Sequence, residues 1–151
     1  MISIQISVDV ACPVDFAFNY LIDPDNYLSW QSGLTHVSAD PPGPIRVGSL
    51  VETKGKLLGR AITTVAKTAE LEHNKRQVYE SVGGPFYYRG ELRLEPLEIG
   101  TRITHQIHAD LDAFFILTKT VLYLAAKTKL SGDLDVLKEI LESLYSASAQ
   151  P

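Results

Sequence analysis

The segment from residue 113 to residue 146 restricts the possible folds more than any other part of the chain. In its second half the leucines recur at steps of four and three with charged residues between them: Leu130, Leu134, Leu137, Leu141 and Leu144. This spacing puts them on one stripe of a helix. The first half is apolar on nearly every side and is broken only by Lys119, Lys127 and Lys129. So much apolar surface must be covered, and the strand-like middle of the chain is the only candidate.

The length of this segment raises the question of a bend. A straight helix of about 34 residues would measure about 50 Å, whereas a compact domain of this size is roughly 40 Å across. Ser131-Gly132 is the expected place for a kink, because glycine weakens a helix and serine can bond back to a carbonyl. We expect one helix kinked there, with two separate helices as the second choice. Asp112 is the expected N-cap.

Composition and charge exclude several classes of protein. The net charge is −4, and the basic residues of one predicted hairpin are diluted by Glu52, so this hairpin is interpreted as a solvated face and no nucleic acid is expected as a partner. Those basic residues are Arg46, Lys54, Lys56, Arg60 and Lys67. The single cysteine, Cys12, cannot form an internal disulfide and is typical of a reducing, cytoplasmic location. Buried in apolar surroundings, it is expected to be inert.

The length of 151 residues predicts one domain, 1–151. The apolar stretch 113–126 is too short to span a bilayer, which needs about 20 residues. No HExxH, CxxC or His/Cys cluster is present, so no metal and no other cofactor is expected. We expect a monomer or a weak homodimer.

The remaining segments are strand-like, apart from two short helices. Residues 2–10 alternate apolar and polar side chains, which is typical of a half-buried strand. Pro13 begins a first short helix, and Asp23-Pro24 caps and begins a second that ends at Trp30. Further strands are expected near residues 35–39, 49–57, 61–72, 76–82, 86–95 and 101–111, separated by turns of which Gly83-Gly84 is the strongest.

This order of elements resembles the helix-grip fold of the START-like superfamily, and most closely its polyketide cyclase/dehydrase-like branch, SRPBCC. The resemblance covers essentially the whole chain and rests on these residues: Val10 with Pro13, Phe18, Leu21, residues 23–26, Trp30, residues 47–49, 58–60 and 100–104, and residues 133–142. It implies an α+β fold in which a curved, seven-stranded antiparallel sheet wraps around a long C-terminal helix, with two short helices between strands 1 and 2. Members bind apolar or amphipathic molecules, and some are cyclases or dehydratases; the resemblance therefore implies a ligand cavity without specifying a reaction.

Apolar and polar side chains alternate in the last two predicted strands, and this alternation indicates which side chains face inward. Tyr88, Leu92 and Leu94 should face inward from one strand, and Ile103, His105 and Ile107 from the other. His105 is then a titratable group on an apolar face. If Leu94 pairs with Thr101, Gly90 lies opposite His105 and leaves space beside the ring. His105 would line the cavity and bond a ligand or an inward Glu80; the alternative is a buried histidine satisfied by a carbonyl or by Tyr88.

Other candidate ligand-binding residues have structural alternatives as well. Trp30 could close one end of the cavity with its indole N–H available to a ligand, or it could simply pack in the core. The phenol of Tyr88 could donate to a ligand carbonyl, or it could be a core tyrosine with a partner in the protein. The strand at 76–82 is ambiguous, because one phase turns Glu80 inward and the other turns Tyr79 inward. Apolar residues of the long helix should form the cavity's other wall: Phe114, Phe115, Leu117, Val121 and Leu124.

Three functions remain open at this point. The first is binding of a small hydrophobic or amphipathic ligand (lipid, polyketide or aromatic type) between the sheet and the C-terminal helix. The second is a cyclase or dehydratase in the same cavity, with His105 as general acid/base. The third is a protein-interaction module. A cavity with several convergent polar groups would favour the enzyme. A smooth apolar cavity with His105 as its lone polar group would favour ligand binding without catalysis. A filled interior with an exposed Phe114-Phe115 patch would favour the protein-interaction module.

Overall fold

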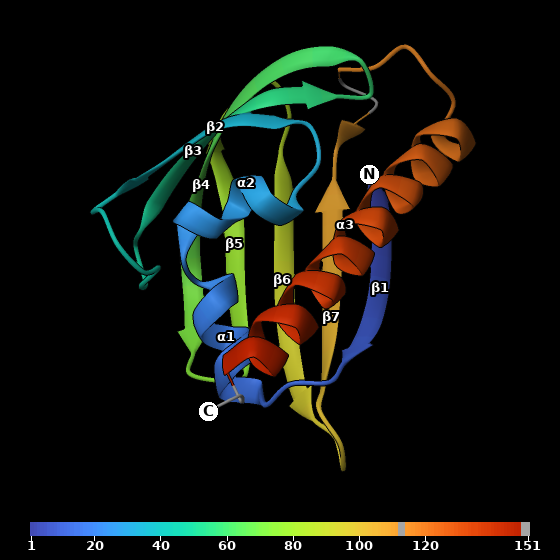
Figure 1. Ribbon diagram of the computed structural model, residues 1–151. Helices are drawn as coiled ribbons and strands as arrows, with labels where there is room; N and C mark the ends of the chain where they lie inside the picture. Colours follow the sequence, from blue (N-terminus) through green and yellow to red (C-terminus); the bar gives the residue numbers. More distant parts are fainter. Residues whose placement is uncertain (112–113, 149–151) are drawn as a thin grey trace.

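The computed structural model describes residues 1–111 and 114–148 (Figure 1). In these residues seven strands form one antiparallel sheet in the order β1-β7-β6-β5-β4-β3-β2. Their bounds are β1 Ile2–Val10, β2 Leu34–Asp40, β3 Leu50–Leu57, β4 Arg60–Glu72, β5 Arg76–Gly83, β6 Tyr88–Pro96 and β7 Thr101–Ala109. The predicted helix-grip architecture is confirmed, and each predicted strand differs from the observed one by no more than two residues at either end.

Two short helical segments connect β1 to β2. Helix α1 spans Val14–Leu21, a 3₁₀ turn η1 spans Pro24–Asn26, and α2 spans Tyr27–Trp30. The side chain of Asp23 accepts a hydrogen bond of 3.0 Å from the backbone N–H of Asp25, and Pro24 occupies the first position, as expected for a capped helix start. These segments cover the end of the sheet that the long helix leaves open (Figure 1).

The C-terminal helix α3 spans Lys119–Ser148 and crosses the sheet in front of β7 and β1 (Figure 1). It continues through Ser131-Gly132 without interruption, and Figure 1 shows no sharp bend there, so the expected kink is wrong. The expected start was also wrong. Thr118 caps the helix, because its hydroxyl accepts from the N–H of Val121 at 3.3 Å, whereas Asp112 lies outside the described residues. No helix in the described ranges is long and apolar enough to cross a membrane.

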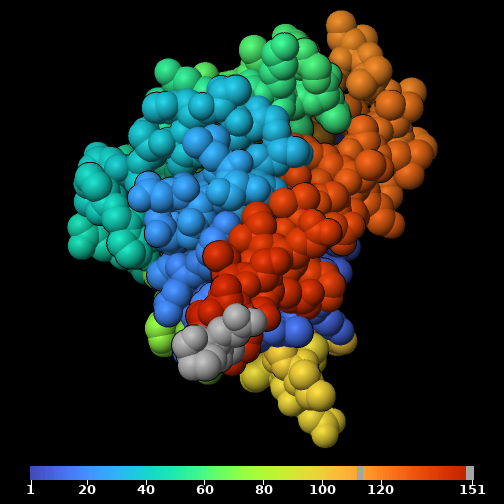
Figure 2. Space-filling model, viewed as in Figure 1, coloured from blue at the N-terminus to red at the C-terminus, as the bar shows by residue number. Residues whose placement is uncertain are grey.

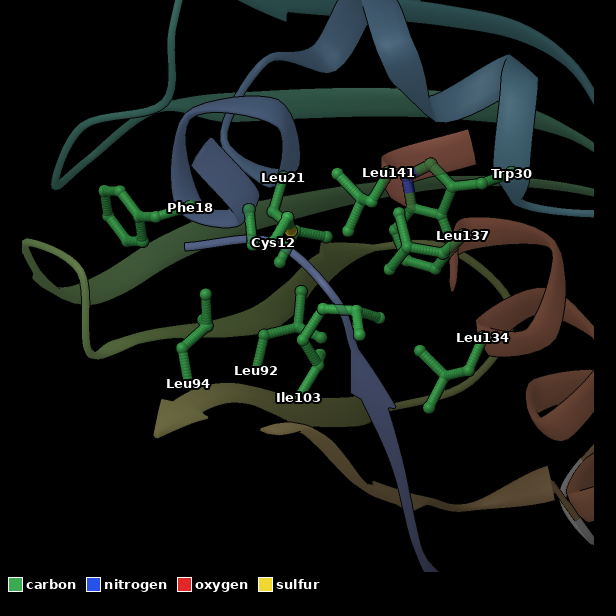
Figure 3. Packing of buried hydrophobic residues seen from close by; sticks show 12 residues of the cluster. Cys12, Phe18, Leu21, Trp30, Leu92, Leu94, Ile103, Leu134, Leu137 and Leu141 are labelled. Atoms are coloured by element: carbon green, nitrogen blue, oxygen red, sulfur yellow. The ribbon is translucent and has the colours of Figure 1, made fainter. Parts of the chain in front are cut away.

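The helix and the sheet do not pack against each other uniformly. One buried cluster joins α1, α2 and the C-terminal half of α3 to β6 and β7; its most central side chains include Phe18, Leu21, Leu92, Leu137 and Leu141 (Figure 3). A second cluster joins the N-terminal half of α3 to β1 and the end of β7, through Ile2, Ile4, Ala109, Leu122 and Ala126. Ile6 of β1 packs against both clusters.

The register of β6 and β7 differs from the expected one by two residues. Leu92 pairs with His105 and Gly90 pairs with Ile107. Because side chains alternate with a period of two, a shift of two residues leaves every side chain on its predicted face. Leu92, Leu94, Ile103 and His105 are accordingly buried on the concave side.

Candidate functional site

A cavity of about 240 Å³ lies between the concave face of the sheet and the helices, with side chains from both buried clusters in its wall. Most of the wall is apolar. It is formed by Ile2, Ile4, Val51, Leu57, Ala66, Phe86, Leu92, Ile107, Ala109, Leu111, Ala126 and Leu130. The alanines contribute little volume, so the space between the longer side chains stays open.

Helix α3 contributes one face to this cavity. Ala126, Lys129, Leu130 and Asp133 line it, at spacings of three, four and seven residues that bring them to the same side of a helix. Ala126 and Leu130 are apolar, while Lys129 and Asp133 add charge. The helix therefore contributes both apolar and charged side chains to the cavity wall.

The polar centre of the cavity is a pair formed by Tyr79 and His105. The phenol oxygen of Tyr79 lies 2.7 Å from Nε2 of His105. Tyr79 belongs to β5 and His105 to β7, so the tyrosine side chain must cross the intervening β6, and it does so over Gly90. A methyl group built on Gly90 would overlap the ring of Tyr79. Glycine is required at this position because the ring occupies the place of its side chain.

Both members of the pair are uncharged at neutral pH. Burial lowers the pKa of His105 to about 4, assisted by the positive charge of Lys129 and opposed by Asp133. Burial also raises the pKa of Tyr79 well above its ordinary value. A neutral imidazole has one N–H and one lone pair, so with Nε2 engaged by Tyr79 the other ring nitrogen, Nδ1, has no hydrogen-bond partner among the described residues.

An ion pair next to His105 closes the polar side of the cavity. The ammonium of Lys129 lies 2.7 Å from one carboxylate oxygen of Asp133, and the other oxygen accepts from the backbone N–H of Ser32 at 3.0 Å. Asp133 is only 4% exposed. These contacts satisfy the buried carboxylate and also fasten α3 to the segment that follows α2.

Further hydroxyl and amide groups continue this polar side along the sheet. The amide of Gln77 donates to the hydroxyl of Thr68 at 3.3 Å and also bonds the phenol of Tyr27, and burial raises the pKa of that phenol to about 12. The phenol of Tyr88 lies 2.8 Å from the hydroxyl of Thr64. The presence of these groups means that the cavity is not wholly apolar, although each of them already has a hydrogen-bond partner in the protein.

Of the residues predicted to bind ligand, five line the cavity: Trp30, Tyr88, Leu92, His105 and Ile107. Glu80 does not, because β5 has the opposite phase and turns Tyr79 and Gln77 inward. The Glu80 carboxylate instead lies on the outer face, where it accepts from Tyr87 at 3.3 Å and faces Arg89 at 3.7 Å. Tyr79 was the residue that sequence reasoning left undecided, and Gly90 on the next strand was the available signal.

The predicted helical wall was misplaced by about half a turn. Leu117, Val121 and Leu124 are 49%, 48% and 56% exposed and point away from the cavity. Ile103 is fully buried, but in the cluster beside the cavity and not in its wall. Phe115 is buried, so the exposed Phe114-Phe115 patch that would have favoured a protein-interaction module is not observed.

Trp30 has a second role besides lining the cavity. It packs with Leu137 and Leu141 in the cluster between α2 and α3 (Figure 3). Its indole nitrogen is buried and has no hydrogen-bond partner within the described residues. The predicted alternatives, core packing and cavity wall, are therefore both observed for this side chain.

Comparison with known proteins agrees with this geometry. A family model described as "Polyketide cyclase / dehydrase and lipid transport" matches residues 1–144. No curated protein sequence matches significantly. The Zhui aromatase/cyclase from Streptomyces sp. R1128 is 18% identical and superposes with a TM-score of 0.78 over 99% of both chains.

Two further solved structures have the same fold. A START superfamily protein from Mycobacterium smegmatis is 13% identical, with a TM-score of 0.76 over 94% of this chain and 98% of that one. The di-domain ARO/CYC StfQ from the steffimycin biosynthetic pathway is 16% identical, with a TM-score of 0.75 over 95% of this chain and 51% of its own length.

Proposed function

Because this chain belongs to the polyketide cyclase/dehydrase and lipid transport family, we propose that its cavity binds one small, largely apolar molecule whose polar group meets His105. The observation behind this proposal is a largely apolar cavity in whose wall Nδ1 of His105 has no hydrogen-bond partner among the described residues. A neutral imidazole nitrogen can donate to a carbonyl or accept from a hydroxyl, depending on its tautomer, so a ligand carrying either group would give Nδ1 a partner.

The size of the cavity limits the ligand. An engineered apolar cavity of about 150 Å³ accommodates benzene. At the packing density of protein interiors, a space of 240 Å³ holds about a dozen non-hydrogen atoms. A bicyclic aromatic compound or a short acyl chain matches this size.

The charge of the wall favours an uncharged ligand. His105 is neutral, and the charges of Lys129 and Asp133 cancel within their ion pair. A ligand carboxylate or ammonium group would lose its hydration here without a free counter-ion, which is costly. We therefore favour phenols, ketones and alcohols over fatty acids and amines.

Native mass spectrometry of freshly purified protein, combined with calorimetric titration of 2-naphthol, tests the proposal. Ala126→Phe would fill the cavity from the helix side, because Ala126 lies in its wall, and should abolish binding. Ala125→Phe places the same ring on the adjacent, less buried position and should bind as the parent protein does. If the Ala126→Phe protein binds as tightly as its Ala125→Phe control, the cavity is not the site.

A second candidate, dehydration of a hydroxyketone in the same cavity, is favoured by the Tyr79–His105 pair. A neutral imidazole can take a proton from the carbon next to a ketone, and a proton returned to the departing hydroxyl releases it as water, leaving a conjugated enone. The aldol of benzaldehyde and acetone is a suitable probe, since its enone product absorbs strongly. His105→Asn should abolish product formation. A parent protein that forms no more enone than buffer does would leave binding as the function.

A further inference from the structure

The start of α3 presents a patch of apolar side chains to solvent, beyond the edge of the sheet. We call it the 116–127 patch; it comprises Ile116, Leu117, Lys119, Val121, Leu124 and Lys127. Ile116 is completely exposed, and Leu117, Val121 and Leu124 are each about half exposed. Isolated exposed leucines are ordinary, but here two exposed apolar residues lie just before α3 and two lie in its first turns, and such a group marks an interaction site.

These exposed side chains are not a misplaced part of the core. On the same turns of α3, Leu122 and Ala126 are buried against the sheet, and Ala126 also lines the cavity. The helix therefore has one apolar face inside and a second one outside. The inner face accounts for the folding of this segment, and the outer face has no described partner.

The charges around the patch have one sign. From Phe114 to Gly132 the sequence contains three lysines and no acidic residue. Lys129 is paired with Asp133, but Lys119 and Lys127 are exposed and form no ion pair with a described residue. The remainder of the protein is acidic enough to give a net charge of −4, so the positive charge of this end is local.

The neighbouring hairpin adds to the same surface. Arg60, at the turn between β3 and β4, donates to the backbone oxygen of Phe114, and its guanidinium lies 3.7 Å from the centre of the Phe114 ring. Arg60 and the nearby Lys56 are exposed. Arg60 of the basic hairpin thus lies beside the segment that precedes α3.

We propose that the 116–127 patch docks on the surface of an anionic lipid bilayer. Apolar side chains flanked by lysines are the features by which helices lie in a membrane interface, where the leucines enter the acyl boundary and the lysines meet anionic headgroups. Figure 2 shows this end of α3 and the segment before it projecting from the body. A projecting apolar end suits a fluid bilayer, which deforms around it, better than a protein partner, which would need a matching hollow.

The test is co-sedimentation of the protein with vesicles of phosphatidylcholine and phosphatidylserine, compared with vesicles of phosphatidylcholine alone. We expect binding to the mixed vesicles, weakened by salt, and little binding to the neutral ones. Lys119→Gln and Lys127→Gln should each weaken binding about five-fold. Val121→Glu combined with Leu124→Glu should abolish it.

The matched control uses the other half of the same helix. Val136 and Leu144 are 40% and 46% exposed, so Val136→Glu with Leu144→Glu introduces the same charges at similar exposure without touching the patch. This control should bind vesicles like the parent protein, and circular dichroism should show both double variants folded.

Three results would overturn the proposal. They are equal sedimentation with neutral and mixed vesicles, equal loss of binding in the control variant, and the absence of vesicle binding. If instead the parent protein dimerises and Val121→Glu with Leu124→Glu makes it monomeric, a second copy of the chain occupies the patch. None of these measurements depends on a ligand in the cavity, so failure here leaves the proposed function standing.

Discussion

The hydroxyl of Tyr79 lies 2.7 Å from Nε2 of His105, although a whole strand separates the two residues. Their contact depends on the missing side chain of Gly90, over which the tyrosine ring passes. The polar centre of the cavity is therefore built by three adjacent strands, each contributing one element: a phenol, a gap and an imidazole.

Gly90→Ala should displace the Tyr79 ring and break its hydrogen bond to His105. Forcing a methyl group into an occupied position costs about 1–3 kcal/mol of unfolding free energy. Urea denaturation measures this cost, and it should nearly vanish when Gly90→Ala is made in a Tyr79→Ala background. An equal cost in both backgrounds would show that something other than the ring opposes the methyl group.

Burial of His105 should make stability depend on pH between about 4 and 6.5. The unfolded chain binds a proton at pH 6.5 and below, whereas the folded protein does so only below about 4, so the unfolded state holds more protons in this window. Stability should fall by about 3 kcal/mol as the pH drops from 6.5 to 4. His105→Asn should lose this part of the pH dependence, while the contributions of exposed carboxylates such as Asp9 remain in both proteins.

The ion pair beside His105 should control the pKa of its imidazole in opposite directions. Lys129 lowers that pKa and Asp133 raises it. Lys129→Met should therefore raise it and Asp133→Asn should lower it further, as measured by NMR titration of the ring protons. Asp133→Asn should also cost about 1–3 kcal/mol, because it leaves the Lys129 charge partly buried without its partner. Shifts of the same sign in both variants would contradict this account.

Gly132→Ala should stabilise the protein. Gly132 lies in the continuous part of α3, is exposed, and a methyl group there would meet no other atom within 4 Å. Alanine favours a helix over glycine by about 1 kcal/mol, so the thermal midpoint should rise by several degrees. A lower midpoint would mean that the helix is distorted at this residue.

Much of the fold could be predicted from periodicity, because the alternation in strands such as Ile2–Val10 states directly which face is buried. The register of β6 and β7 could not, since turns of different lengths satisfy the same alternation. The side of α3 that faces the sheet was also missed. Its first turns are apolar on several sides, so the sequence has no polar face to indicate that Val121 and Leu124 lie outside.

The site was only partly predictable for a related reason. His105 and Tyr88 follow from their strands, but the choice between Tyr79 and Glu80 required the pairing of Tyr79 with Gly90, which depends on the register of β5 and β6. The ion pair of Lys129 and Asp133 was also missed as part of the cavity. In sequence both look like ordinary helix-surface residues; in the structure Asp133 is buried where α3 meets Ser32, and Lys129 is partly buried beside it.

The position of the cavity between two packed clusters bears on how a ligand would stabilise the protein. Side chains of both clusters stand in its wall. A molecule filling the cavity would contact both clusters at once and would bind only the folded chain, so its binding should raise the thermal midpoint.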